Sequence, residues 1–327
     1  MVKHSEKVRV FKTSLYLLLI FNKFHNLPIK IIKMKKITLV LSGGGARGIA
    51  HIGVIEELEN RGFEVTSIAG TSMGALVGGV YALGKMPEFK DWLLTLDKKE
   101  TFRLLDFTFS TQGLIKADRV LERMKEFMPN ELIEELPVKF TATATDIKNK
   151  EEVVFKKGLL FDAVRASIAV PTVITPVEMN NRILVDGGVV NNLPISNAIR
   201  TDGDILVAVT VNARIPAINR KKTTEEKKAK ETLYKSKMKA LQEYFNIAKA
   251  KDKSSKISYF NILTNSYDMM LNRLQMDTVR LYNPDIFIEI PHKTCSLFDF
   301  YRAEELVDVG RYVAAYTIDK YERKINR

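Results

Sequence analysis

Ser72 lies at the centre of Gly70-Thr71-Ser72-Met73-Gly74, the Gly-x-Ser-x-Gly pattern that surrounds a nucleophilic serine. A serine presented in this way needs a turn so tight that only small residues fit beside it, and Gly70 and Gly74 meet that need. Earlier in the chain, Gly43-Gly44-Gly45-Ala46-Arg47-Gly48 can present backbone N–H groups to an oxyanion, each donor lowering the barrier by about 3 kcal/mol. Together, the two motifs predict acyl transfer to a serine.

The elements around both motifs are predicted from apolar patterns. Residues 37–41 form a short, fully apolar, β-branched run, which is typical of a buried parallel strand. A helix is expected over 49–61, a strand over 65–69 and a helix over 73–83. Ser72 therefore lies on a strand-to-helix turn, the context that the nucleophile motif requires.

The rest of the chain continues the alternation of strands and helices. We expect strands at 138–143, 151–155, 182–185, 204–211 and 285–290, and helices within 87–128 and at 161–169 and 301–321. The second and third of these strands differ in role: 151–155 pairs with 138–143 across a short turn, and 182–185 leads directly into Asp186-Gly187-Gly188. This pattern predicts an α/β fold with a mostly parallel central sheet.

The serine needs a base, and His292 and Asp186 are the two residues considered for that role. His292 follows the last predicted strand, in the chain order of an α/β-hydrolase base, whereas His51 lies on a helix that packs against the sheet. Asp186 ends a strand, and Gly187-Gly188 lets the backbone turn at once and approach a neighbouring loop. Partial desolvation beside the serine would raise the pKa of this carboxyl and strengthen it as a base. Asp186 is favoured, which gives a Ser–Asp dyad.

The glycine loop has a competing interpretation. Gly43-x-Gly45-x-x-Gly48 between a strand and a helix also matches the dinucleotide-binding fingerprint. That fingerprint expects an acidic residue at the end of the second strand, where this chain instead has the serine turn, so a nucleotide site is disfavoured. Arg47 is expected either to hold the loop or to meet a substrate phosphate.

Basic charge is concentrated in two segments, although the whole chain carries +12. Residues 1–33 carry a net +6 and residues 220–256 a net +8, which leaves the rest near neutral. In the absence of a nucleic-acid motif, this charge indicates peripheral contact with an anionic membrane surface rather than with nucleic acid. A solvated helix face is the alternative. Apolar positions at helical spacing within 224–249 predict an amphipathic helix.

The N-terminal segment is treated as an extension. Residues 15–21 resemble a signal-peptide core or a short interfacial anchor, but Met34 stands one strand before the glycine loop and is an alternative start. We therefore expect an extension at 1–33 and a catalytic domain at 34–327, with a basic helical insertion at about 214–256. The expected location is the cytoplasm or the membrane periphery, with anchoring or export only if residues 1–33 are retained.

The three motifs, in their order and spacing, resemble those of the patatin-like phospholipases. The glycine loop 43–48, the serine turn 70–74 and Asp186-Gly187-Gly188 carry the resemblance, and Ala166-Ser167-Ile168-Ala169-Val170-Pro171 adds to it. The resemblance implies a three-layer α/β/α fold, with Ser72 as nucleophile, Asp186 as proton acceptor and Gly43, Gly44 and Gly45 as the oxyanion loop. Arg47, Gly48, Gly70, Gly74, Gly187 and Gly188 would support these motifs.

The same resemblance implies hydrolysis of phospholipid, lysophospholipid or neutral-lipid esters, with no metal and no cofactor. Two other classes remain open: an acyltransferase or thioesterase on the same dyad, and a non-catalytic lipid-binding module. The single cysteine, Cys295, excludes an intrachain disulfide and is expected to be a packing residue.

Overall fold

The apolar run at 37–41 forms the middle of β1 (Lys35–Leu41), a strand of a sheet whose other members come from distant parts of the chain. The computed structural model describes residues 34–104, 118–129, 131–171, 173–216 and 259–326. Lys35–Arg327 forms one compact unit. The predicted extension at 1–33 and most of the predicted basic insertion lie outside the described residues.

Five strands make the parallel part of the sheet. They are β3 (Lys139–Asp146), β2 (Phe63–Thr71), β1, β7 (Ile205–Ala213) and β8 (Ile286–Pro291), hydrogen-bonded in that order. Each adjacent pair is parallel. The predicted strands at 37–41, 65–69, 138–143, 204–211 and 285–290 are thereby confirmed, with ends shifted by a few residues.

Three strands make the antiparallel part. They are β4 (Glu151–Phe155), β6 (Arg182–Asp186) and β5 (Val177–Met179). Both β4 and β6 pair antiparallel with β3, and β5 continues the sheet beyond β6. The hairpin of β3 and β4 confirms the predicted pairing, whereas β5 was not expected from the sequence because three residues carry too little pattern.

One face of the sheet carries most of the helices. They are α2 (Ala50–Asn60), α3 (Met73–Ala82), α4 (Met86–Thr95), α5 (Lys98–Leu104), α6 (Asp118–Phe127), α7 (Leu160–Ser167) and α10 (Ala303–Ile325). Alternate residues of the parallel strands, such as Leu39, Ile68 and Val209, point to this face and join the main hydrophobic core. The predicted helices at 49–61, 73–83, 161–169 and 301–321 correspond to α2, α3, α7 and α10.

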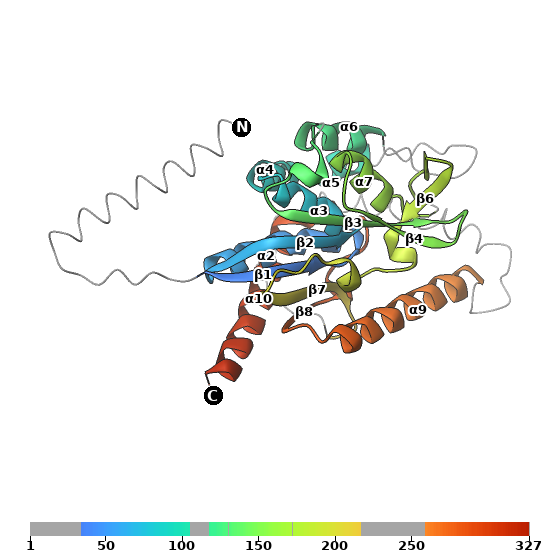
Figure 1. The fold of residues 1–327 in the computed structure, drawn as a ribbon. Helices are drawn as coiled ribbons and strands as arrows, with labels where there is room; N and C mark the ends of the chain where they lie inside the picture. Colours follow the sequence, from blue (N-terminus) through green and yellow to red (C-terminus); the bar gives the residue numbers. More distant parts are fainter. Residues whose placement is uncertain (1–33, 105–117, 130, 172, 217–258, 327) are drawn as a thin grey trace, which may run out of the picture. The chain divides into compact units, whose positions relative to one another are not determined.

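The other face is covered by residues 193–198 and by α9 (Tyr259–Tyr282). Val40, Ala69 and Ala208 point to this face, and Val279 of α9 packs there. Figure 1 shows α3 to α7 above the sheet and α9 below it. The three-layer arrangement with a mostly parallel sheet is therefore confirmed.

Helix α9 was not predicted, and its polarity explains why. Met269, Met270 and Leu274 are exposed, whereas Gln275 is buried. An inward amide and outward methionines contradict the pattern by which surface helices are recognised in a sequence. Among the described residues, no helix is long and apolar enough to cross a membrane.

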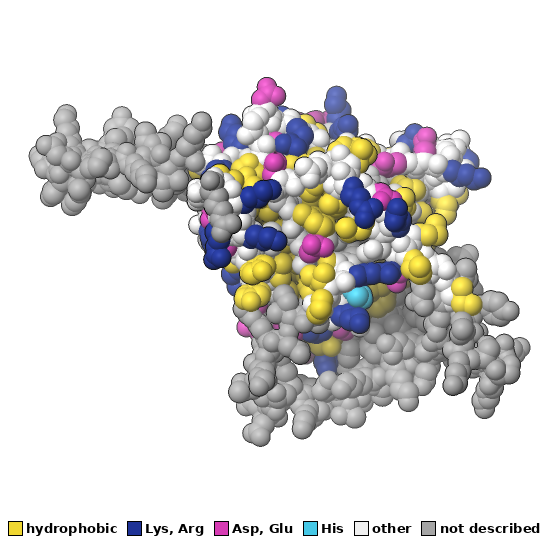
Figure 2. Space-filling model, turned by 90° about the horizontal axis from the view of Figure 1, so that it is seen from below, with side chains coloured by type: hydrophobic (Ala, Val, Ile, Leu, Met, Phe, Trp, Pro, Cys, Tyr) yellow, Lys and Arg dark blue, Asp and Glu magenta, His cyan; other side chains and the backbone are white. Residues whose placement is uncertain are grey.

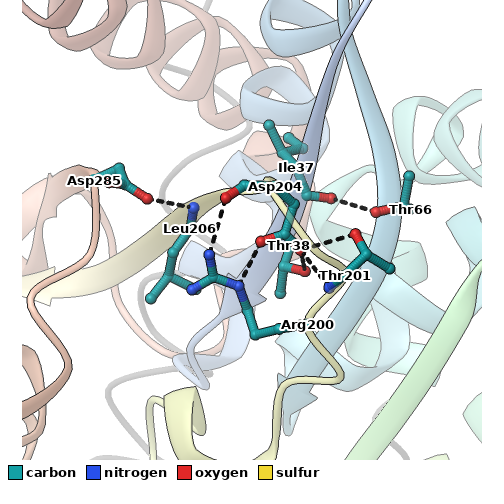
Figure 3. Close-up of polar contacts among 8 residues, drawn as sticks. All are labelled: Ile37, Thr38, Thr66, Arg200, Thr201, Asp204, Leu206 and Asp285. Carbon is teal, nitrogen blue, oxygen red and sulfur yellow. Dashed lines mark hydrogen bonds and ion pairs between the residues drawn. The ribbon is translucent and has the colours of Figure 1, made fainter.

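A polar cluster fixes the sheet at the end away from the predicted site. The buried carboxylate of Asp204, just before β7, accepts from the Thr38 hydroxyl of β1 at 2.5 Å and from Arg200 Nε at 2.5 Å. It also accepts from the backbone N–H and the hydroxyl of Thr201, at 2.9 and 3.1 Å (Figure 3). These bonds tie the segment that enters β7 to the neighbouring strand.

Candidate active site

Ser72 lies on a strained turn between β2 and α3. Its backbone has φ 55° and ψ −124°, a left-handed conformation that costs a non-glycine residue about 1–3 kcal/mol. The chain is so close to itself here that a Cβ on Gly70 would lie 2.5 Å from the Gly74 oxygen. A Cβ on Gly74 would lie 2.3 Å from the Leu41 oxygen. The two flanking glycines are therefore required by space, as the sequence predicted.

Ser167, at the end of α7, holds the turn in place. Its hydroxyl accepts a hydrogen bond from the Ser72 backbone N–H at 2.9 Å and donates to the Thr143 oxygen of β3 at 2.6 Å. All three residues are buried. Sequence reasoning did not assign this role, although Ser167 stands in the segment 166–171 that carries part of the family resemblance. A polar residue inside an otherwise apolar helix end was the available signal.

The sheet topology brings Asp186 to Ser72. Strand β2 pairs with β3 up to Thr71 opposite Thr143, and β6 arrives antiparallel with Asp186 opposite Ala144. Because β4 occupies the other edge of β3, β2 and β6 follow one another along the same edge and meet end to end. The residue after β2 and the last residue of β6 therefore face each other.

Asp186 is buried and has two hydrogen-bond donors. The Ser72 hydroxyl lies beside its carboxylate, where it acts as a donor that lowers the pKa, and the Gly188 N–H donates to Oδ1 at 2.7 Å. Burial raises the pKa of Asp186 to about 6, against the opposing effect of these two bonds. A carboxylate with this pKa is ionised at neutral pH and is a stronger base than an exposed one.

The two glycines after Asp186 allow the close approach of this loop. A Cβ on Gly187 would lie 2.3 Å from the Thr143 oxygen, so no larger residue fits. A Cβ on Gly188 would lie 3.0 Å from Asp186 Oδ1 and would crowd the bond that the Gly188 N–H makes. The supporting role of both glycines in the motif stays a prediction, to which this lack of space adds a physical reason.

The glycine loop lies against the nucleophile. A Cβ on Gly43 would be 3.0 Å from Ser72 Cβ, and Gly45 has φ 57°. The Gly43 N–H donates to the Asn192 oxygen at 3.1 Å and is therefore engaged within the protein. The N–H groups of Gly44 and Gly45 donate to no acceptor within the described ranges. These two remain available for an oxyanion.

Arg47 holds the glycine loop. Its guanidinium donates to Asn212 Oδ1 at 2.9 Å and to the His292 oxygen at 3.1 Å. Of the two roles considered for it, the structure supports the first. Gly48 lets the loop pass α3, because a Cβ there would lie 2.3 Å from Met73 Cγ.

The two histidines that the structure describes, His51 and His292, are engaged elsewhere. His292 Nδ1 lies 3.1 Å from the Ala213 oxygen, and within the described part of the chain no hydrogen bond joins His292 to Ser72 or Asp186. His51 is fully buried, with Nε2 2.9 Å from the Ser42 oxygen, and burial lowers its pKa to about 4. His51 is thus a neutral packing residue of α2.

A cavity of about 160 Å³ opens beside Ser72 and Gly45 on the helical side of the sheet. Its wall is almost wholly apolar, as ligand pockets for hydrophobic groups are. The apolar lining residues are Met73, Leu76, Phe89, Trp92, Leu93, Leu96, Leu104, Val120, Met124, Ile168, Val170, Val173, Ile174, Leu297, Phe298 and Phe300. Hydrocarbon is the chemistry that such a wall accommodates.

A cluster of metal-binding side chains is not found among the residues that the structure describes. Across the described ranges, no group of three or more His, Cys, Asp or Glu side chains is placed to bind a metal ion. Cys295 is buried, and burial raises the pKa of its thiol to about 12, so it is not a ready nucleophile.

A serine on a strained strand-to-helix turn, a buried carboxylate and an apolar cavity together define a candidate active site in an α/β protein. Comparison with known proteins narrows the class. A family model described as patatin-like phospholipase matches residues 39–199. An uncharacterised NTE family protein of Mycobacterium tuberculosis is 33% identical, over 88% of this chain and 92% of that protein. The chain belongs to the patatin-like phospholipase family.

Other similarities are more partial. Lysophospholipase NTE1 of Candida glabrata is 31% identical over 51% of this chain and 10% of its own length. The crystal structure of VipD from Legionella pneumophila is similar with a TM-score of 0.43 and 15% identity, covering 88% of this chain and 67% of that one.

Proposed function

We propose that this protein hydrolyses carboxylic ester bonds of phospholipids or lysophospholipids through a Ser72–Asp186 dyad. The observation that carries the proposal is the placement of the Ser72 hydroxyl beside the buried Asp186 carboxylate, where β2 and β6 meet at the mouth of an apolar cavity. Membership of the patatin-like phospholipase family supports lipid hydrolysis, and one relative is named a lysophospholipase.

The first half of the reaction acylates the serine. Ser72 Oγ attacks the acyl carbonyl carbon as its proton passes to Asp186. The carbonyl oxygen becomes an oxyanion and accepts from the N–H groups of Gly44 and Gly45. The ester C–O bond then breaks, and Asp186 returns the proton to the departing alcohol or lysolipid oxygen.

The second half releases the fatty acid. Water attacks the acyl-enzyme carbonyl while Asp186 accepts a proton from it. The tetrahedral intermediate collapses, the bond to Ser72 Oγ breaks, and Asp186 gives the proton back to that oxygen. The raised pKa of Asp186, near 6, suits both directions of transfer at neutral pH.

The apolar cavity is proposed to hold the acyl chain. Its walls come from α4 to α6, the segment after α7 and residues 297–300, and their side chains offer methyl, methylene and aromatic groups. Burying each methylene of a chain is worth about 0.8 kcal/mol, so long-chain esters should be preferred over acetate.

We further propose peripheral contact with an anionic membrane surface. The basic segments 1–33 and 220–256, with net charges of +6 and +8, support attraction to anionic lipid. Figure 2 shows exposed hydrophobic side chains on the described part of one face, with Lys and Arg side chains and also Asp and Glu side chains among them.

The test compares three variants on a p-nitrophenyl ester. Ser72→Ala and Asp186→Ala should each abolish turnover above background, whereas His292→Ala should retain it. Loss of turnover in His292→Ala alone would return the site to a histidine triad. Binding of Ser72→Ala to vesicles, with no reaction of the wild type toward a fluorophosphonate, would indicate a non-catalytic lipid-binding module.

Product analysis then separates hydrolysis from transfer. Mixed membrane lipids are incubated with the wild type or with Ser72→Ala, and the lipids are profiled. Free fatty acid with the matching lysolipid supports hydrolysis, whereas new diacyl lipid formed from added lysolipid indicates an acyltransferase.

A further inference from the structure

We propose that Gln275 of α9 is a positioning residue for the glycine loop, acting through Asn192, Thr210 and Asn212 on the peptide group of Gly43. The inference rests on the proposed function, in which the N–H groups of Gly44 and Gly45 receive the oxyanion. It assigns a role in the reaction to a helix on the opposite face of the sheet from the acyl cavity.

Gly43 is held at both its N–H and its carbonyl oxygen, which belong to the peptide groups on either side of it. Its N–H donates to the Asn192 oxygen at 3.1 Å, and its oxygen accepts from Asn212 Nδ2 at 2.6 Å. Asn192 Nδ2 makes a longer contact with the same oxygen, at 3.5 Å. Because the Gly43 carbonyl and the Gly44 N–H belong to one planar peptide unit, the bonds to that oxygen fix the direction of the first available N–H group and the start of the loop that carries the second.

Gln275 of α9 makes hydrogen-bond contacts that lead to both asparagines, one directly and one through Thr210. Its Nε2 donates to Thr210 Oγ1 at 2.8 Å, and its Oε1 lies 3.5 Å from Asn192 Nδ2. Thr210 Oγ1 also accepts from the Asn212 backbone N–H at 3.1 Å. The bonds therefore run from Gln275 to Gly43 by two routes, one through Asn192 and one through Thr210 and Asn212.

The backbone of β7 is irregular where it joins this network. The register between β7 and β8 shifts between Thr210 and Ala213. The Asn212 side chain reaches Gly43 on one side and accepts from Arg47 at 2.9 Å on the other, which fixes its orientation. A regular strand would alternate its side chains between the two faces without this lateral reach.

The burial of Gln275 supports a specific role. Only 4% of the residue is exposed, although neighbouring positions of α9 leave large apolar side chains in solvent. Burying a side-chain amide is costly unless its groups are hydrogen-bonded, and an apolar residue would fill the space at lower cost. Since a displacement of about 1 Å can lower a rate by about 10²-fold, a rigid donor loop is a sufficient reason for the amide.

The first experiment uses Gln275→Met, which keeps the length of the side chain and removes both polar groups. The matched control is Arg273→Met on the same helix, where the arginine side chain is 72% exposed and pairs only with Asp277 among the residues described around it. Reactive sites are counted with a fluorophosphonate, and kcat is expressed per reactive site on a long-chain p-nitrophenyl ester. We expect about a tenfold lower kcat in Gln275→Met, KM within twofold, and wild-type values in the control.

A structural role alone gives a different result. It would reduce the number of reactive sites or the melting temperature and leave kcat per reactive site unchanged, and that outcome overturns the proposal. If Ser72→Ala were as active as the wild type, the proposed function itself would fail. That result differs from every outcome of the Gln275→Met measurement, which leaves Ser72 unchanged.

A second variant tests the network without changing α9. Thr210→Val removes the hydroxyl that accepts from both Gln275 and Asn212 and keeps the side-chain shape. We expect a similar loss of kcat, and a double variant with Gln275→Met that is no slower than the slower single variant. Losses that multiply would show independent effects and contradict a shared network.

Affinity for a long-chain trifluoromethyl ketone provides a third measurement, because its adduct with the serine carries an oxyanion. It should weaken about tenfold in Gln275→Met, while the affinity for the matching long-chain alcohol stays the same. Equal weakening of both ligands would place the effect in the acyl cavity and overturn the inference.

Discussion

Two buried aspartates lie at opposite ends of the sheet, and their surroundings shift the pKa of the carboxyl group in opposite directions. Asp186 is 5% exposed and Asp204 is 7% exposed. Burial raises the pKa of Asp186 to about 6. Burial also acts to raise the pKa of Asp204, but hydrogen bonds from Thr201, Thr38 and Arg200 outweigh it and lower that pKa.

The difference lies in the donors. The Asp204 carboxylate has four hydrogen bonds and the charge of Arg200 beside it (Figure 3). Among the described residues, the donors at the Asp186 carboxylate are the Ser72 hydroxyl and the Gly188 N–H. A carboxylate surrounded by donors is a poor base because the protein already neutralises it. Burial alone therefore does not predict a raised carboxyl pKa, because enough hydrogen-bond donors and a nearby positive charge reverse its effect.

The largest expected effect is on turnover. Asp186→Asn keeps the shape of the side chain and removes the base, so kcat should fall by about 10³-fold or more. Asp204→Asn makes the same chemical change at the other end of the sheet and should keep kcat per reactive site within twofold. Steady-state kinetics with fluorophosphonate titration measures both, and an equal loss in the two variants would remove the distinction.

The pH dependence of activity should report Asp186 and not Asp204. The base works only when ionised, so kcat/KM should fall about tenfold per pH unit below a midpoint near pH 6 and be flat above it. The profile of Asp204→Asn should have the same midpoint. A midpoint near pH 4 in the wild type would contradict the raised pKa.

Stability should change in opposite directions. Asp204→Asn places an NH₂ group among donors and should lower the free energy of unfolding by about 2–3 kcal/mol. Asp186→Asn removes a buried charge, and the oxygen of the new amide can still accept the hydrogen bond that Oδ1 accepts in the wild type. The melting temperature of this variant at pH 7–8 should therefore rise by about 2–4 °C. Urea and thermal denaturation at pH 7.5 measure both.

The two residues should also give opposite pH slopes of stability. The folded pKa of Asp186 lies above its unfolded value of about 3.9, so its favourable contribution is present below pH 4 and is lost as the pH rises toward 6. The folded pKa of Asp204 lies below its unfolded value, so its contribution is present above pH 4 and is lost as the pH falls further. Comparing each Asn variant with the wild type across pH 3–8 isolates the two slopes.

The smallest effect concerns a single partner. Thr38→Val removes one of the four hydrogen bonds to Asp204 and should cost about 1 kcal/mol of stability. Turnover and its pH midpoint should not change, because β1 is held by its other pairings. Urea denaturation beside an activity profile checks this, and a shifted pH midpoint would show that the two ends of the sheet are coupled.

Much of the fold could be predicted because its patterns are local. The apolar run at 37–41, the strand before the serine turn and the glycines at 70 and 74 report short-range requirements of backbone space and burial. The parallel strands and the helices α2, α3 and α10 followed from those patterns. The approach of Asp186 to Ser72 depends on β2 and β6 sharing one edge of β3, which the motifs suggest only through resemblance to a family.

The supporting polar residues could not be predicted, because no periodicity marks them. Ser167, Asn192, Asn212 and Gln275 come from four separate elements or loops and meet only in the folded chain. Gln275 is further concealed by α9, where the exposed apolar side chains reverse the expected pattern. A small polar residue at the end of a predicted helix, such as Ser167, is the signal that this sequence offers for such a role.

The wall of the apolar cavity also contains an intrinsic fluorophore. Trp92 is the single tryptophan of the chain, and it lines the cavity that opens at Ser72. Indole emission depends on the polarity and packing around the ring, so hydrocarbon entering or leaving the cavity would change the colour or brightness of the whole protein's fluorescence. Each turnover with an unlabelled natural lipid could thus be followed in a stopped-flow instrument, without a chromogenic ester.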